Sequence, residues 1–551
     1  MSHYSKIFNK VPVQIPNKSG FDLSHENLFT AKCGTLVPVL VDTLLPNDTI
    51  SLGHSSQLQL PPMATDFYGR VMGKFEAFFV PFRILYGGWQ ELITHPVDGA
   101  NYPSGTTSGQ KATFLPAIKG LKSKMLAGSL ADYLGRRVEA LPSDTASQTL
   151  TLPNFLPFAA YHKIYNDWYR DSRIQQDVFD RSKTVDPVTG TPNFAAMPWQ
   201  VLSGSTAKEM SGDSLLCADG VSCLDLRQRN WEKDYFTNAT PKPQAGDAAQ
   251  LAFDVSDGQG SFTIASLRAA NSLQQWLERN NIAGYRYGDQ IKAQFGIYPA
   301  DAVTDRAIYL GSHTVDIYNR SVYQSNSPSD YVGVADDTVK GNPFNSVGSK
   351  FGNPQGVGEN SLVDKFTASE HGFIFVMFSI VPRAYYGTGD RRYLSYNNVS
   401  DFAFPILAGV GDQEIWKSEL ASGFSSLIKI PFGYTQRYSE YKYMDDEVHG
   451  LLRDGQSLSA FALKRSFGVE SDVNLGSQFL QIPQTFLDQV GVWTQADSGN
   501  PDSYLVNSFG AWCDVFFAYK KVSTLPAYSI PTLGDMKDTH TEVIENGGKR
   551  L

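Results

Sequence analysis

Cysteine and long apolar runs are both scarce in this sequence. Only four of its 551 residues are cysteine, Cys33, Cys217, Cys223 and Cys513, and no two of them have the CxxC spacing of a zinc or redox site. We therefore expect neither a disulfide framework nor a zinc ribbon, and a reducing compartment is the simpler interpretation. The longest apolar run, FIFVMFSIV at residues 373–381, has the length of a strand and is too short to cross a membrane. The opening MSHYSKIFNKVPVQIP lacks the apolar segment of a secretory signal.

The content of charged residues is also low, and basic residues are fewer than acidic ones. The chain has 47 basic and 56 acidic residues, a net charge of -9, and its charged residues make up 19%, below the usual quarter. A protein that neutralises many phosphates by itself needs a basic excess, so any contact with nucleic acid must be local. Aromatic residues reach 13%, beside 47 glycines and 29 prolines. This mixture favours a β-rich protein with many loops.

Motifs of catalysis and metal binding are absent as well. The nine histidines never form HExxH, and neither a GxSxG elbow nor a Walker loop occurs. The glycine pairs at 387–389 and 409–411 lack the third glycine of a dinucleotide site and are typical of turns. Asp445-Asp446-Glu447 has the chemistry of a hard-cation site, but a solvated acidic turn is the favoured interpretation. We expect no cofactor, no metal and no enzymatic activity.

Two groups of arginine and aromatic residues leave two interpretations open. One joins Arg391 and Arg392 to Tyr393, and the other places Arg227 and Arg229 close to Trp231 and Tyr235 in the sequence. Binders of single-stranded nucleic acid combine these residue types. Protein interfaces are enriched in them too. Composition does not choose between the two.

Strand patterns lie near both ends of the chain. Residues 35–45 form an apolar run closed by a Pro-Asn-Asp turn, and residues 370–383 and 509–521 are aromatic runs of strand length. In residues 70–82, alternation places Val71, Phe75, Ala77 and Phe79 on one face, with Lys74 and Glu76 on the other. We predict a half-buried strand there, with the candidate core residues Val71, Phe75 and Phe79.

The middle of the chain differs from the ends. Leu267, Ala270, Leu273 and Leu277 recur at helical spacing and predict a helix over 263–281, with a shorter one near 289–295. Residues 313–365 are rich in Ser, Asn, Gly and Asp, which predicts a long surface loop. The division that follows is an N-terminal arm at 1–34, first sheet strands at 35–90, long insertions with helices and surface loops at 91–369, the remaining strands and interface loops at 370–525, and a C-terminal tail at 526–551.

Several segments carry a resemblance when they are taken in order. The turn Leu45-Pro46-Asn47-Asp48-Thr49 is followed by FEAFFVPFRILYGGW, YNDWYRDSRIQQ and KDYFTNATPKPQAG, and later by LERNNIAGYRYGDQIKAQFG, EHGFIF, GDQEIW and GYTQRYSEYKYMDDEVHGLLR. Each is a weak string alone, but their common order is specific. They resemble the major capsid protein family of the Microviridae, small icosahedral phages with circular single-stranded DNA, and most of all its gokushovirus branch.

The resemblance implies a mainly β fold, an eight-stranded antiparallel jelly roll of the viral capsid type with large loop and helix insertions. It implies a T=1 icosahedral shell built from copies of this chain around the DNA. The implied partners are a small basic DNA-binding protein, an internal scaffolding protein, a DNA pilot protein and a host surface receptor. The protein would be made in the bacterial cytoplasm and reside in the virion. Because a separate basic protein accompanies the DNA, the charge of -9 is no obstacle.

One departure from the gokushovirus pattern concerns the surface of the particle. Family members carry a long insertion between the PxPQ segment and the LER helix, which is associated with threefold protrusions. Here only residues 247–262 separate the two segments. We therefore expect no prominent threefold protrusion, and the loop at 313–365 becomes the candidate host-facing surface.

The run YNDWYRDSRIQQDVF combines aromatic and charged residues over the length of a helix. A nucleic-acid surface, a catalytic cluster and a protein interface are all compatible with these residue types, but no nucleophile, base or ligand set accompanies them. Catalysis is therefore excluded. The resemblance makes the stretch structural, and Tyr165, Trp168, Tyr169, Arg170 and Asp171 are the candidate subunit-interface residues. Arg170 and Asp171 would fix a local bend or a subunit contact through charge-assisted hydrogen bonds.

Two other functions compete with the capsid role. A carbohydrate-binding or carbohydrate-active β-sandwich would suit the many aromatics and loops, and in an enzyme it would need two carboxylates facing one groove. A plain single-strand DNA-binding protein is disfavoured by the net charge.

Overall fold

The chain is described here from a computed structural model. The structure describes residues 18–60, 67–94, 115–136, 149–180, 193–196, 209–210, 215–246, 264–324, 350–421, 429–468, 473–487 and 510–527. Its helices are α2 (Trp89–Thr94), α3 (Leu130–Tyr133), α4 (Leu156–Ile164), α5 (Ile264–Ala283), α6 (Tyr287–Phe295) and α7 (Ser477–Leu480). Its strands are β1 (Ser19–Asp22), β2 (His25–Ala31), β3 (Val37–Leu44), β4 (Thr49–Gln59), β5 (Val71–Pro81), β6 (Ala117–Leu121), β7 (Thr149–Leu152), β8 (Glu209–Met210), β9 (Ile308–Gln324), β10 (Lys350–Thr367), β11 (Gly372–Pro382), β12 (Gln413–Trp416), β13 (Pro431–Thr435) and β14 (Ala511–Ser523).

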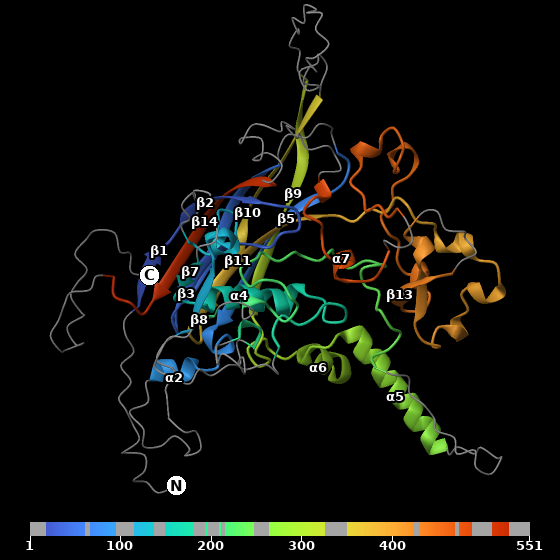
Figure 1. Ribbon diagram of the computed structural model, residues 1–551, viewed down its shortest axis with the longest axis horizontal. Coiled ribbons are helices and arrows are strands. Elements are labelled where there is room, and N and C mark those ends of the chain that lie inside the picture. Colours follow the sequence, from blue (N-terminus) through green and yellow to red (C-terminus); the bar gives the residue numbers. More distant parts are fainter. Residues whose placement is uncertain are drawn as a thin grey trace, which may run out of the picture.

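One antiparallel sheet joins strands from both ends of the chain. Its order is β1-β14-β4-β10-β9-β5-β11-β3, and β2 also pairs with β14. Figure 1 shows β14, from the C-terminal part of the chain, running beside strands of the N-terminal part. The mainly β, antiparallel capsid-type fold with insertions is confirmed. The strands predicted at 35–45, 370–383 and 509–521 are confirmed as β3, β11 and β14.

The inner face of the sheet holds the first hydrophobic cluster. Val71, Phe75 and Phe79 of β5 are fully buried in it. The Phe75 ring lies 4.7 Å from the ring of Phe378 and 4.4 Å from that of His54. Burying one such side chain stabilises the fold by about 2 to 3 kcal/mol, so this face contributes much of the sheet's stability.

Strand β5 is buried on both faces, which makes the half-buried prediction wrong. Phe78 and Val80 point to the second face and enter a second hydrophobic cluster with residues of α4 such as Phe158 and Tyr161. Lys74 is partly covered as well. The residues of β5 do alternate between the two faces, as predicted. The second face was expected to be exposed to solvent, but residues distant in the sequence cover it, among them those of α4.

The predicted surface loop at 313–365 is wrong for its two ends, because these residues belong to β9 and β10. Both strands lie in the middle of the sheet. Close approach explains the glycines there: a Cβ at Gly358 would lie 2.4 Å from Val315 Cγ2 of the neighbouring strand. The centre of the candidate host-facing surface, residues 325–349, lies outside the described residues.

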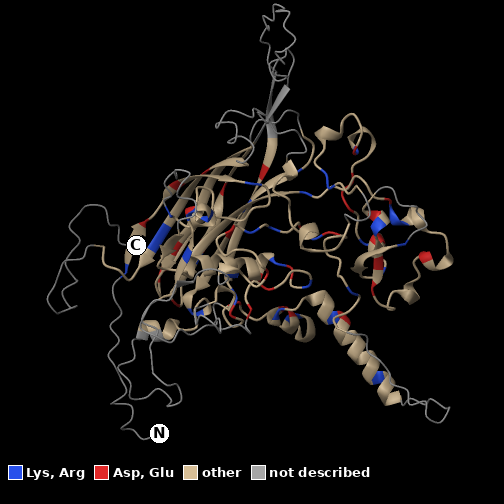
Figure 2. Ribbon diagram, in the orientation of Figure 1, with Lys and Arg blue, Asp and Glu red and all other residues tan. Residues whose placement is uncertain are grey.

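A third hydrophobic cluster forms a separate unit beyond the sheet, at the right of Figure 1. It includes Ile415 of β12 and Phe432 of β13, which form a two-stranded sheet, and Phe479 of α7. Blue and red segments are interspersed along the described ribbon, without a region of one sign (Figure 2). Within the described ranges, no helix is long and apolar enough to span a membrane.

The two predicted helices of the middle region are confirmed as α5 and α6. Helix α6 ends at Phe295, and the next residue, Gly296, has a φ of 69°, the left-handed conformation in which glycine commonly terminates a helix. The two helices pack against each other. They lie below the sheet and the third cluster in Figure 1.

Candidate functional site

Helix α4 ends in a wide turn followed by a bend. Asn154 Oδ1 accepts a hydrogen bond from the Leu156 N–H at 2.9 Å, and Pro157 lies in the first turn, where its missing N–H is tolerated. At the other end, Tyr165–Tyr169 form a π-helical turn, after which Arg170 has an extended backbone with φ -72° and ψ 136°. Such π-helical turns are rare. Here the turn directs its aromatic and charged side chains toward several neighbouring segments.

The aromatic residues of the turn connect it to the sheet. Trp168 Nε1 donates to the Ala307 carbonyl at 2.8 Å, and the Arg306 guanidinium lies 3.8 Å from the centre of the Trp168 ring. The Tyr169 hydroxyl donates to Glu76 Oε2 at 2.7 Å. Glu76 belongs to β5, and Ala307 directly precedes β9. The turn is therefore tied to two adjacent strands.

Glu76 is also the partner of a buried arginine. Arg229 forms an ion pair with Glu76, and its guanidinium lies 5.1 Å from the centre of the Tyr169 ring. Burial alone would raise the pKa of Glu76, but the charge and hydrogen bonds of Arg229 lower it below its usual value. Burial raises the pKa of the Tyr169 phenol, and the carboxylate of Glu76 raises it further. The three side chains form an intramolecular unit whose charges are neutralised within the chain.

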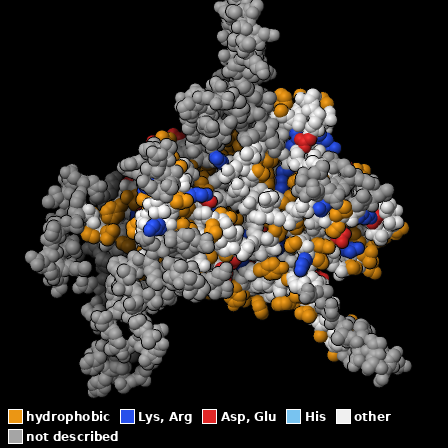
Figure 3. Space-filling model, viewed as in Figure 1, with side chains coloured by type: hydrophobic (Ala, Val, Ile, Leu, Met, Phe, Trp, Pro, Cys, Tyr) orange, Lys and Arg blue, Asp and Glu red, His pale blue; other side chains and the backbone are white. Residues whose placement is uncertain are grey.

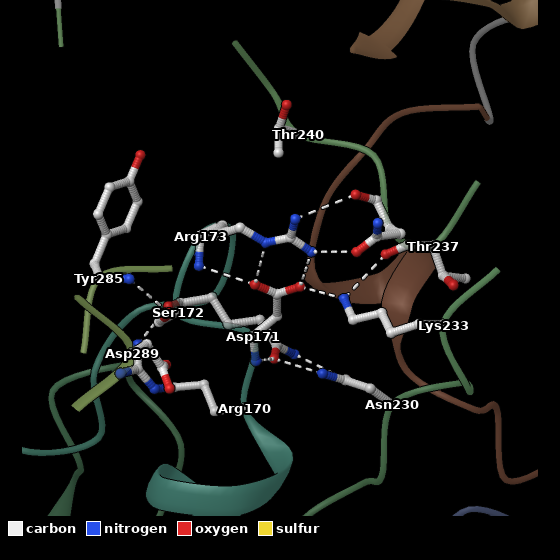
Figure 4. Close-up of polar contacts among 12 residues, drawn as sticks. Arg170, Asp171, Ser172, Arg173, Asn230, Lys233, Thr237, Thr240, Tyr285 and Asp289 are labelled. Carbon is white, nitrogen blue, oxygen red and sulfur yellow. Dashed lines mark hydrogen bonds and ion pairs between the residues drawn. The ribbon is translucent and has the colours of Figure 1, made fainter. Parts of the chain in front are cut away.

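Asp171 is the centre of a second polar cluster, shown in Figure 4. Arg173 Nε lies 3.1 Å from Asp171 Oδ1 and Arg173 Nη2 lies 3.0 Å from Oδ2, while Lys233 Nζ also contacts Oδ2. Burial opposes the charged form of Asp171, but the hydrogen bonds and charges of Arg173 and Lys233 lower its pKa well below the usual range. Its backbone N–H donates to Gln175 Oε1 at 2.8 Å. The carboxylate is thus a fixed anion that holds the bend closed.

Arg170 and Ser172 connect the bend to the segment between α5 and α6. Arg170 Nη1 donates to the Gln175 carbonyl at 2.8 Å. Arg286 Nη2 donates to the Arg170 carbonyl at 2.6 Å, and the Tyr285 N–H donates to Ser172 Oγ at 3.1 Å. The bend is therefore a junction that joins the sheet, the segment around Lys233 and the base of the two helices.

The structure brings the five candidate interface residues together inside the chain. Tyr165, Tyr169, Arg170 and Asp171 are at most 8% exposed, and Trp168 is partly exposed. The hydrogen bonds of Arg170 and Asp171 to Gln175 agree with the local-bend alternative. A subunit contact through them stays a prediction. Val71, Phe75 and Phe79 lie elsewhere, inside the sheet.

In the two groups of arginine and aromatic residues, the arginines form ion pairs with carboxylates of the same chain. Arg227 pairs with Asp219 at 2.5 Å, and Arg229 with Glu76. Arg391 pairs with Glu447 at 2.5 Å and Arg392 with Glu419 at 3.1 Å. Each of the four cations is therefore paired with a carboxylate, which removes the main support for phosphate binding at these positions.

A polar cleft in the third unit was missed by sequence reasoning. Its lining includes Arg391, Arg392, Glu419, Asp445 and Glu447. Burial raises the pKa of both Glu419 and Asp445 to about 7. The expected solvated acidic turn does not describe Asp445, whose side chain is partly buried. In the part of the chain that the structure describes, no group of three or more His, Cys, Asp or Glu side chains is arranged to hold a metal ion.

Comparison with known proteins places the fold in a family. The model of the family described as capsid protein (F protein) matches residues 9–258 and 250–533, most of the chain. The chain belongs to this capsid protein family. It is 26% identical to capsid protein VP1 of Chlamydia phage 1, over 96% of this chain and 97% of that protein. It is 25% identical to capsid protein VP1 of Bdellovibrio phage phiMH2K, over 96% and 98%, and 23% identical to that of Spiroplasma virus 4, over 94% and 95%.

Membership in the family gives the chain a structural role. The resemblance to gokushovirus capsid proteins of the Microviridae is confirmed. A capsid protein assembles with copies of itself into a shell and resides in the virion. Nothing in these comparisons supports the carbohydrate-binding alternative.

Proposed function

We propose that this capsid protein is the major subunit of a T=1 icosahedral shell that encloses a circular single-stranded DNA genome and catalyses no reaction. The observation that carries the proposal is the family match from residue 9 to residue 533, on a chain whose antiparallel sheet combines strands from its N-terminal and C-terminal parts. Rotational contacts around fivefold and threefold axes and isologous contacts at twofold axes would close the shell.

The net charge of the subunit supports the proposal that a separate protein neutralises the phosphates of the genome. A net charge of -9 and arginines engaged with carboxylates leave little positive charge for DNA phosphates. A small basic DNA-binding protein would supply it. An internal scaffolding protein, a DNA pilot protein and a host surface receptor complete the proposed partners, and synthesis takes place in the bacterial cytoplasm.

The proposed division of the chain follows the strands. The arm at 1–34 contributes β1 and β2 to the edge of the sheet, beside β14. The region 91–369 contributes β9 and β10 along with its helices, and 370–525 contributes β11 and β14. The tail at 526–551 follows. In this scheme the contacts around Asp171 fix the orientation of the inserted helices and loops relative to the sheet.

Electron cryomicroscopy of particles purified from cells that carry the encoding phage genome tests the proposal. We expect closed shells of uniform small diameter, with one copy of this chain in each icosahedral asymmetric unit and its sheet recognisable in the density. Protein staining should show this chain as the dominant band. Particles in which it is a minor, non-shell component would contradict the proposal, as would an isolated chain that binds glycans and forms no shells.

A further inference from the structure

Helix α5 exposes most of its surface. Of its 20 residues, Asn280 and Asn281 in the last turn are the ones that the described chain buries. Figure 1 shows the helix extending away from the sheet at the lower right. A helix gains most of its stability from packing one face against other parts of a structure. Among the described residues in the first turns of α5, none is buried.

Helices α5 and α6 pack against each other, and both helices and the loop after α6 carry exposed apolar residues. Figure 3 shows hydrophobic side chains over both helices. We define the α5–α6 surface by six residues, each about half exposed or more: Leu273 (48%), Trp276 (50%), Tyr287 (75%), Phe295 (75%), Ile297 (61%) and Tyr298 (76%). Soluble monomers rarely expose so many large apolar side chains together.

The composition of the α5–α6 surface fits a protein partner. Aromatic residues are enriched at the centres of protein interfaces, where charged residues are depleted. The charges nearby are partly matched: Lys292 Nζ lies over the Tyr298 ring at 4.7 Å, and Arg286 lies 3.7 Å from Asp289. The six residues that define the α5–α6 surface include no basic residue, whereas binders of single-stranded DNA combine stacking aromatics with a positively charged groove.

The size of the surface suits a stable contact between subunits. One aromatic side chain offers roughly 150 to 250 Å², so the four aromatics at their observed exposures present on the order of 400 to 700 Å². Leu273 and Ile297 add to this area. A standard interface buries about 800 Å² on each partner, so the α5–α6 surface is close to one complete half of an interface.

We propose that the α5–α6 surface is covered by a neighbouring copy of this chain in the shell. The inference rests on the proposed function, because a capsid subunit surrounds itself with copies of itself. It goes further by placing one subunit contact on the projecting helices, away from the junction around Asp171.

The test introduces the double variant Leu273→Ser with Trp276→Ser into the phage genome. The matched control is Arg268→Ser with Gln275→Ser, two exposed residues on a different face of the same helix. We expect the yield of closed particles to fall at least tenfold for the first variant and to stay at the wild-type level for the control. The soluble chain should accumulate as unassembled subunits with an unchanged thermal unfolding curve. In wild-type particles, density of a neighbouring copy should contact the Trp276 indole.

Four outcomes separate the possibilities. Normal particle yield from the double variant would overturn the inference while leaving the proposed function intact. Density of a different protein or of DNA against Trp276 would overturn it too, as would a soluble variant that unfolds at a clearly lower temperature, because the face would then be packed by its own chain. Absence of shells from the wild-type genome would instead contradict the proposed function.

Discussion

Strand β11 and helix α5 both carry a pattern of apolar residues, yet the strand is buried and the helix is largely exposed. All eleven residues of β11 are buried between strands and two hydrophobic clusters, whereas the described chain buries two of the twenty residues of α5. The sheet is thus completed by its own chain. The α5–α6 surface is left for another molecule. A subunit that must assemble needs apolar residues both for its core and for contacts with other molecules. Substitutions in the sheet should therefore impair folding, and substitutions in the α5–α6 surface should impair assembly alone.

The largest effect is expected in the sheet. Phe75→Asp places a charge in the fully buried inner cluster, where an unpaired ion costs several kcal/mol or more. We expect soluble protein to be lost, measured as the soluble fraction after expression. Ser55→Asp, at an exposed position on β4, is the control and should remain soluble. A soluble, folded Phe75→Asp protein would contradict the assignment of this face as the core.

The junction should rank second. Asp171→Asn keeps the size of the side chain but leaves Arg173 and Lys233 without their shared anion, and breaking a buried pair in this way costs about 3 to 5 kcal/mol. We expect a lower unfolding temperature, measured by calorimetry. Asp177→Asn, at a half-exposed carboxylate 3.6 Å from Arg170, should change stability by less than about 1 kcal/mol. Equal effects of the two variants would show that Asp171 does not hold the bend.

The close approach of β9 and β10 provides a third test. Gly358→Ala would place a Cβ 2.4 Å from Val315, and overpacking of this kind costs about 1 to 3 kcal/mol. Denaturant unfolding should show the loss. At Gly409 a Cβ would meet no atom within 4 Å, so Gly409→Ala should be close to neutral. If Gly358→Ala left the free energy of unfolding unchanged, the close approach of β9 and β10 at this position would not be needed for stability.

The polar cleft predicts a pH dependence. The pKa of Asp445 is raised by burial to about 7, so the folded state holds this proton more tightly than the unfolded state. The associated stability is complete below about pH 4 and is lost as the pH rises through 7. Asp445→Asn should therefore be more stable than wild type at pH 8, by on the order of 1 to 3 kcal/mol, and equal to it near pH 4. Asp446→Asn, which removes a partner of Arg383, should not gain stability at pH 8.

The smallest effect on stability is expected in α5. Leu273→Asp lies on the exposed helix, and surface substitutions usually change the free energy of unfolding by no more than about 0.5 kcal/mol. Chemical denaturation of the unassembled subunit measures this. A loss comparable to that of Asp171→Asn would remove the contrast between the sheet and the α5–α6 surface.

Local patterns predicted elements well where one segment carried the whole signal. The aromatic run predicted as a strand at 509–521 is β14, and the helix predicted from the spacing of Leu267, Leu273 and Leu277 is α5. The pattern failed in β9 and β10, because polar and glycine-rich residues become strands when neighbours pair with them on both sides. Asp445 was misjudged for a related reason: residues distant in the sequence, such as Tyr235 and Phe236, line the same cleft and help to bury it partly.

The sequence by itself determined the family, through motifs that keep their order along the chain, and the mainly β class, through periodicity and composition. It also excluded the common catalytic motifs. Only the tertiary structure decided that Arg170 and Asp171 lie inside the subunit, that four arginines face carboxylates, and that α5 is left uncovered. Burial and charge pairing depend on which distant segments meet, and a linear pattern does not contain that information.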